Sequence, residues 1–76
     1  MTDDAKYIVT KDGCMVIFEN FLEHSRFIGL RPISAGFIWF DGGRCGCYGR
    51  SESLKLESRP EIDTEIAVRK IMRFES

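Results

Sequence analysis

Several features that would point directly to a function are scarce in this 76-residue sequence. It contains one His, one Trp and two Pro, and its formal net charge is -1. That balance gives no general attraction to nucleic-acid phosphates or anionic lipids. No apolar run approaches the ~20 residues of a membrane-spanning helix, and the start lacks the basic-then-apolar order of a signal peptide. We therefore expect neither segment and no membrane partner.

Cysteine is sparse and odd in number, at three residues. Without a secretion signal, such cysteines are most simply reduced thiols, which predicts a cytoplasmic protein. What the chain does have is apolar material, since 43% of its residues are hydrophobic and 12% are aromatic. This is enough for a folded core, so residues 1–76 are predicted to form one small domain, with residues 1–5 frayed.

The densest apolar run is SAGFIWF at residues 34–40, bounded by Pro32 and by the Gly42-Gly43 pair. Its length and its aromatic and β-branched residues predict a strand. Both alternating faces of that strand are apolar, so we expect it in the interior of a sheet that is covered on both sides.

Turn residues place further strands around this run. Asp12-Gly13 divides the β-rich stretch at residues 6–19, which predicts a hairpin with a type I′ turn. Gly42-Gly43 predicts a second hairpin, whose return strand begins at Arg44 and runs through Tyr48.

The next segment leaves two interpretations open. Gly49 marks a bulge or bend after the second hairpin. Residues 53–57 alternate, with Leu54 and Leu56 expected to point inward. They either continue the fourth strand or form a fifth one.

Residues 20–30 are ambiguous between a short helix and an ordered loop. Asn20 is a candidate helix cap, and Glu23 three residues later would complete a capping box. In either form we expect this segment to cross the sheet and cover one of its faces.

A C-terminal helix is predicted to begin near Pro60. Ser58 and Glu61 have the spacing of a capping box, and acidic residues near the start with basic ones near the end suit the helix dipole. Its predicted apolar face comprises Ala67, Val68, Ile71, Met72 and Phe74, with Ile62 and Ile66 to the side. The fold class is therefore α+β: an antiparallel four- or five-stranded sheet of two β-hairpins, with a C-terminal helix packed on one face.

Four short motifs carry a resemblance to known sequences. They are His24-Ser25, Ser34-Ala35-Gly36-Phe37, Cys47-Tyr48-Gly49 followed by Ser51, Ser53 and Leu54, and Ser58-Arg59-Pro60-Glu61. In these the chain resembles, from Lys11 onward, a group of small uncharacterised proteins from bacterial genomes and prophages. One Cys precedes the Tyr-Gly pair in that group, so Cys45 is a departure from its pattern. The resemblance implies a cytoplasmic setting and a helix after Pro60, and it implies no activity.

A zinc site and a catalytic site are the chemical alternatives. The four possible zinc ligands are Cys14, His24, Cys45 and Cys47, but a Cys-x-Cys pair on a strand lacks the usual spacing of structural zinc sites. Glu23, His24 and Ser25 are adjacent and do not face one another, so they form no triad. We expect no cofactor, no small-molecule substrate and no enzymatic activity.

Binding through contacts with another macromolecule is the remaining class. A sheet with two apolar faces and one long helix leaves one face partly uncovered, which predicts a protein partner or self-association as a homodimer. The candidate surface comprises Trp39, Tyr48, Arg44 and Arg50. The alternative is a single-stranded nucleic-acid-binding domain that stacks bases on sheet-face aromatic residues, with Phe37 and Phe40 added to that set.

Overall fold

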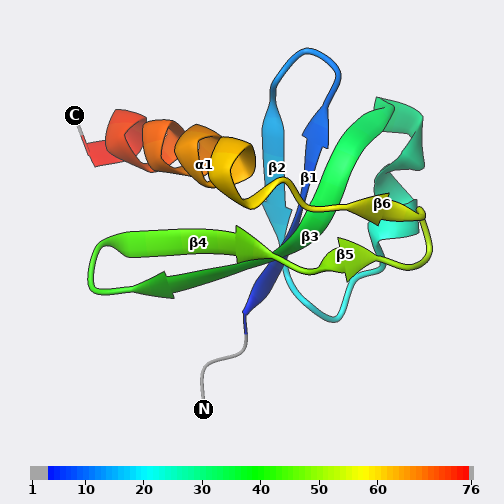
Figure 1. Ribbon diagram of the computed structural model, residues 1–76, viewed down its shortest axis with the longest axis horizontal. Helices are drawn as coiled ribbons and strands as arrows, with labels where there is room; N and C mark the ends of the chain where they lie inside the picture. Colours follow the sequence, from blue (N-terminus) through cyan, green and yellow to red (C-terminus); the bar gives the residue numbers. More distant parts are fainter. Residues whose placement is uncertain (1–3, 76) are drawn as a thin grey trace.

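The sheet forms the centre of the molecule, with a helix on one side and a thinner layer on the other. The computed structural model describes the backbone of residues 4–75 and the side chains of residues 4–71. Figure 1 shows the elements in chain order. They are β1 (Ala5–Thr10), β2 (Met15–Phe18), the 3-10 helix η1 (His24–Leu30), β3 (Pro32–Asp41), β4 (Arg44–Tyr48), β5 (Arg50–Ser51), β6 (Leu56–Glu57) and α1 (Pro60–Glu75).

Strand β3 lies inside the main sheet, as its apolar sequence predicts. The four antiparallel strands have the order β2-β1-β3-β4, so β1 and β3 each have two neighbours. The predicted fold class, an antiparallel four-stranded sheet with a C-terminal helix packed on it, is confirmed. Ala5 already belongs to β1, which differs from the expectation that it frays, and residues 1–3 lie outside the described part of the chain.

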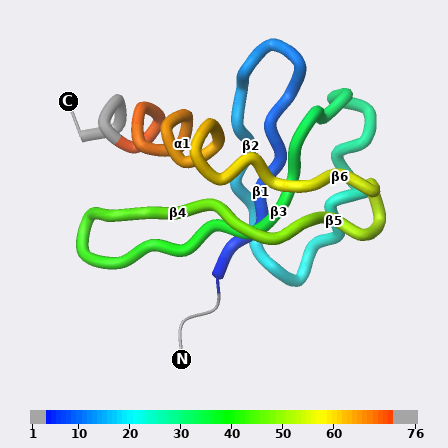
Figure 2. The backbone as a smooth tube through the Cα atoms, in the orientation of Figure 1, coloured from blue at the N-terminus to red at the C-terminus, as the bar shows by residue number. Residues whose placement is uncertain are grey.

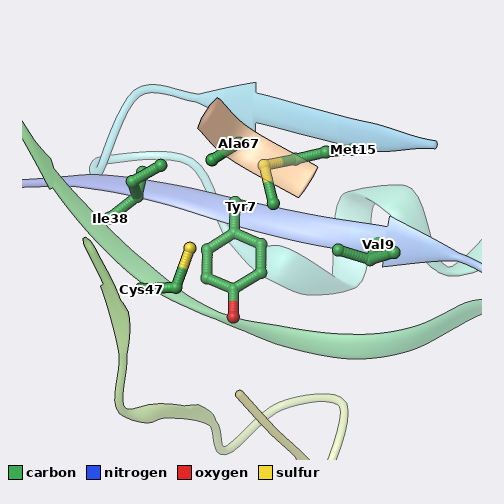
Figure 3. Close-up of a cluster of buried hydrophobic side chains, with 6 residues drawn as sticks. All are labelled: Tyr7, Val9, Met15, Ile38, Cys47 and Ala67. Carbon is green, nitrogen blue, oxygen red and sulfur yellow. The ribbon is translucent and has the colours of Figure 1, made fainter. Parts of the chain in front are cut away.

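Two clusters of buried side chains stabilise the two faces of this sheet. On the helix face, Tyr7, Val9, Met15, Ile38 and Cys47 pack together with Ala67 of α1 (Figure 3). On the opposite face, Ile8, Phe18 and Ala35 are buried under a layer formed by Leu22, Phe27, Leu54 and Leu56. Alternation along the strands sends neighbouring side chains into different clusters, so both faces of β1 and of residues 34–38 in β3 exclude water.

The two hairpin turns differ from each other in geometry. In the first, Thr10 N–H donates to Cys14 O at 2.8 Å and only Gly13 of the loop has a positive φ, at +84°. This is a three-residue loop with a glycine bulge, so the predicted type I′ turn at Asp12-Gly13 is wrong. In the second, Gly42 and Gly43 have φ values of +54° and +86°, as a type I′ turn requires.

Within residues 20–30 the chain forms a kinked 3-10 helix, which begins later than predicted. η1 starts at His24, and Glu23 before it is extended and makes no side-chain capping bond. The capping box proposed for Asn20 and Glu23 is therefore wrong. The segment nevertheless crosses the sheet and covers the face opposite α1, because Leu22 and Phe27 pack against that cluster.

The segment after β4 forms a separate two-stranded sheet. Gly49 has a φ of +77°, and the chain bends there between β4 and β5. Residues 53–55 lie in a turn, and β6 pairs antiparallel with β5. Leu54 and Leu56 both pack inward as predicted, although only Leu56 lies in a strand.

The face with which the C-terminal helix packs overlaps the predicted one in part. α1 lies alongside β4 (Figure 2) and contacts β2 as well. Ala67 is buried and Ile66 packs on the same cluster, whereas Val68 is exposed. The side chains of Met72 and Phe74 lie outside the described residues. At the helix N-terminus Asp63, rather than Glu61, accepts a 2.9 Å hydrogen bond from the Arg59 N–H. The buried face of α1 therefore includes a carboxylate, which a prediction from hydropathy alone leaves out.

Candidate interaction surface

The β3–β4 hairpin has one face that α1 does not cover. Cross-strand pairs place Phe37 opposite Tyr48, Trp39 opposite Gly46 and Asp41 opposite Arg44. Because side chains alternate along a strand, these six residues share the face opposite α1. We call this surface the hairpin face, and Figure 1 shows its turn at the far left, away from η1 and β5–β6.

Trp39 lies across the strand beside it. A Cβ atom built on Gly46 would be 2.4 Å from Trp39 Nε1, so the indole ring occupies the space above that glycine. Gly46 is consequently buried while Trp39 remains 38% exposed. The absence of a side chain at Gly46 allows the ring to pack flat against the sheet and to present its outer side to solvent.

Aromatic rings continue from Trp39 towards the base of the hairpin. Phe37 stacks on Tyr48 with ring centroids 5.7 Å apart, and His24 meets the edge of Phe37 at 5.9 Å. Tyr48 is 41% exposed and its hydroxyl donates to Asp4 Oδ2, which raises the pKa of the phenol. Two aromatic side chains, Trp39 and Tyr48, thus reach the solvent on one face.

His24 packs beneath the Phe37 ring and bonds to β3. Its Nε2–H donates a 2.9 Å hydrogen bond to Gly36 O, and the ring is buried against Phe18 and Phe37. Burial lowers the pKa of the imidazole, because water no longer solvates the charged form. The neutral ring therefore acts as a structural link between η1 and β3.

A pocket of about 400 Å³ opens at the base of the hairpin face. Its lining includes Lys6, Glu23, Phe37, Tyr48, Arg50 and Glu52. Lys6 Nζ donates to Leu22 O at 2.9 Å, which fixes the position of its ammonium group. The lining of the pocket therefore combines aromatic rings with two acidic and two basic side chains.

Among the described residues, no ion pair neutralises the charged side chains of the hairpin face and its pocket. In the described residues the ion pairs are Arg59–Asp63 and Arg69–Glu65, and both lie on or beside α1. Asp41 and Arg44 are exposed cross-strand neighbours at the turn, and Glu52 and Arg50 are exposed at the pocket. Both signs of charge are thus available to a partner at each end of this surface.

The four residues proposed from sequence as an interaction surface come together in part. Trp39, Tyr48 and Arg44 share the hairpin face, and Arg50 lines the pocket beside Tyr48. Phe40 is not part of it: it pairs with Cys45, so by alternation it lies on the helix side.

The four possible zinc ligands are not brought together. Cys14 is exposed at the β1–β2 turn, and Cys45 and Cys47 lie on the helix side. His24 is buried on the opposite face. Among the residues that the structure describes, no group of three or more His, Cys, Asp or Glu side chains is placed to hold a metal ion.

Lys6, Glu23 and Glu52 line the pocket, although the sequence motifs point to Glu23 only as a helix cap or triad member and to Lys6 and Glu52 not at all. Lys6 is the cross-strand partner of Phe37, on a strand thirty-one positions earlier. Only the pairing of β1 with β3 brings it to the pocket. No local signal in the sequence relates Lys6 to Tyr48.

Comparison of the chain with protein-family models, with curated proteins and with solved structures found no match. Within residues 4–75, no helix has the length and apolar content needed to cross a membrane.

Proposed function

We propose that this chain is a non-enzymatic interaction module that self-associates through the hairpin face. The main support is the pair of exposed aromatic side chains, Trp39 and Tyr48, on one side of a hairpin that also carries Arg44. Trp, Tyr and Arg are the residue types that contribute most of the binding energy in protein interfaces. A second copy would cover apolar surface that the fold leaves in water.

The charge pattern favours a protein partner over a nucleic acid. Lys6, Arg44 and Arg50 are interspersed with acidic residues, namely Asp4, Asp41, Glu23 and Glu52. A phosphate backbone gains from an excess of positive charge, which this surface lacks. Ion pairs across a two-fold interface need both signs on one patch, because each copy presents the same surface to the other.

Two further parts of this proposal have separate support. We assign no reaction to the chain, and the buried His24 ring already donates to a backbone carbonyl, so it is a poor candidate for proton transfer. We place the chain in the bacterial cytoplasm, which is consistent with three free cysteines. Cell fractionation tests the location.

Light scattering coupled to size exclusion tests the self-association. We expect the mass to rise from that of the 8.7 kDa chain to twice that value as the concentration approaches ~1 mM, the weak end of measurable affinities. Trp39→Lys places a charge in the centre of the hairpin face and is expected to keep the chain monomeric. Ile62→Lys is the matched control, because Ile62 is a 52% exposed apolar residue on α1, on the other side of the sheet.

The outcomes separate cleanly. A wild-type chain that stays monomeric throughout the concentration series contradicts self-association. A dimer that Ile62→Lys disrupts and Trp39→Lys leaves intact places the interface elsewhere. Thermal unfolding of both variants checks that each is folded at the temperature of the measurement.

Single-stranded nucleic-acid binding is the second candidate, and exposed Trp39 and Tyr48 beside Arg44 are the observation in its favour. Titration of the chain with a labelled oligonucleotide, at two salt concentrations, tests it. Binding that weakens steeply with salt and changes Trp39 fluorescence supports this function. Unchanged fluorescence at saturating oligonucleotide contradicts it.

A further inference from the structure

We propose that two copies pair hairpin face to hairpin face in antiparallel register, so that the turn of each hairpin lies over the pocket of the other. Arg44 of one copy then enters the pocket of the second, between Glu23 and Glu52. This arrangement rests on the self-association proposed above and specifies its geometry.

The layer that covers the rest of the sheet selects the antiparallel register. Leu22, Phe27, Leu54 and Leu56 pack over the face of β1 and β3 at the base of the hairpin, and the hairpin face itself is left open. Figure 1 shows η1 and β6 at the end of the molecule opposite the hairpin turn. If two hairpins met in parallel, the two covering layers would occupy the same space. Antiparallel pairing puts them at opposite ends.

The length of the hairpin fits this register. Arg44 and Tyr48 are the two ends of β4, which places them ~14 Å apart at ~3.4 Å per residue. Trp39 and Gly46 form the pair midway between these ends. Antiparallel pairing corresponds to a two-fold axis that lies in the interface, perpendicular to the strands and at the level of that pair. Such an axis places the turn of one copy over the pocket of the other. It also brings the two Trp39 rings together.

The side chains at the two ends are chemically complementary. Arg44 is exposed, and no ion pair joins it to Asp41 or to another described residue. The pocket lining offers it the carboxylates of Glu23 and Glu52 and the ring of Tyr48. A guanidinium group forms strong hydrogen bonds with carboxylates and stacks on aromatic rings. Asp41 of the same turn would meet Lys6 and Arg50.

A charge-exchange experiment tests this register. Arg44→Glu and Glu52→Arg are each expected to weaken the dimer about tenfold, since each places like charges at both symmetric contacts. The double variant R44E/E52R is expected to recover affinity to within a few-fold of wild type. Sedimentation equilibrium measures the dissociation constants. Glu61→Arg, an exposed acidic residue on α1, is the matched control and should leave the affinity unchanged.

Failure of the register can be told apart from failure of self-association. If Trp39→Lys abolishes the dimer but Arg44→Glu leaves its affinity unchanged, the hairpin face is the interface and the antiparallel register is wrong. If both single variants weaken the dimer and the double variant fails to recover, Arg44 does not meet Glu52 and the register is again wrong. A wild-type monomer removes both proposals.

Discussion

The Tyr7 hydroxyl donates a 2.5 Å hydrogen bond to Asp63 Oδ2, which joins residues 56 positions apart. Asp63 is fully buried and also accepts from the Ser34 hydroxyl at 3.1 Å and from the Arg59 backbone N–H at 2.9 Å. Arg59 adds an ion pair from its side chain at 3.0 Å. One carboxylate therefore holds the start of α1 against β1 and β3, and burial together with this partner raises the pKa of Tyr7.

Removal of the Asp63 carboxylate should destabilise the fold more than removal of the Tyr7 hydroxyl. Tyr7→Phe deletes one hydrogen bond to a charged acceptor, which is expected to lower the free energy of unfolding by ~1.5–3 kcal/mol. Asp63→Ala leaves two buried hydroxyls without an acceptor and is expected to cost ~3–5 kcal/mol. Urea denaturation measures both. Glu65→Ala, which removes the exposed pair with Arg69, should cost no more than ~0.5 kcal/mol. Equal effects of the Asp63 and Glu65 variants would contradict this role.

Substitution of Gly46 should displace Trp39. The Cβ of Gly46→Ala would come within 2.6 Å of three atoms of the indole ring, so the ring must turn away into solvent. We expect a red shift of the Trp39 emission and, with the added strain, a loss of ~1–3 kcal/mol of stability. Gly29→Ala is the control, because nothing lies within 4 Å of a Cβ at Gly29. An unchanged emission maximum in the Gly46 variant would refute the packing described here.

His24 should make the fold sensitive to mildly acidic pH. Its pKa in the folded chain is lowered from 6.5 by burial, so the unfolded chain binds the proton more readily. Stability is therefore fully present above pH ~6.5 and falls as the pH decreases through and below that value. Urea midpoints at pH 7.5, 6.5 and 5.5 measure this decline. Because the chain has a single His, His24→Gln should make the urea midpoint nearly independent of pH between 7.5 and 5.5. If the midpoint falls equally in both proteins, a group other than His24 causes the pH dependence.

The three thiols should react at different rates. Cys14 is exposed, whereas burial raises the pKa of Cys45 and raises that of Cys47 to about 11. The thiolate is the reactive form, so alkylation at pH 8 followed by mass spectrometry should modify Cys14 first and Cys45 more slowly. Cys47 should react only as the chain unfolds. Modification of Cys47 at the rate of Cys14 in the native chain would show that the helix face is open to solvent.

Local pattern predicted much of the architecture. The apolar run at residues 34–40, the glycine turn at Gly42-Gly43 and the helix start at Pro60 correspond to β3, its hairpin and α1. Strand alternation and turn chemistry act between near neighbours, so a single sequence contains them. The predicted type of the first turn is wrong, because Asp-Gly fits both a two-residue turn and a three-residue loop that ends in a glycine bulge.

Local sequence pattern is sufficient to predict the four strands of the main sheet, the second turn and the presence of the terminal helix, since each depends on residues only a few positions apart. The tertiary structure alone decided which side of α1 is buried. Asp63 replaces Val68 on that side, because Tyr7, Ser34 and Arg59 converge on its carboxylate from three separate segments. It likewise decided that Lys6 and Glu52 flank Tyr48, since only the pairing of distant strands brings such residues together.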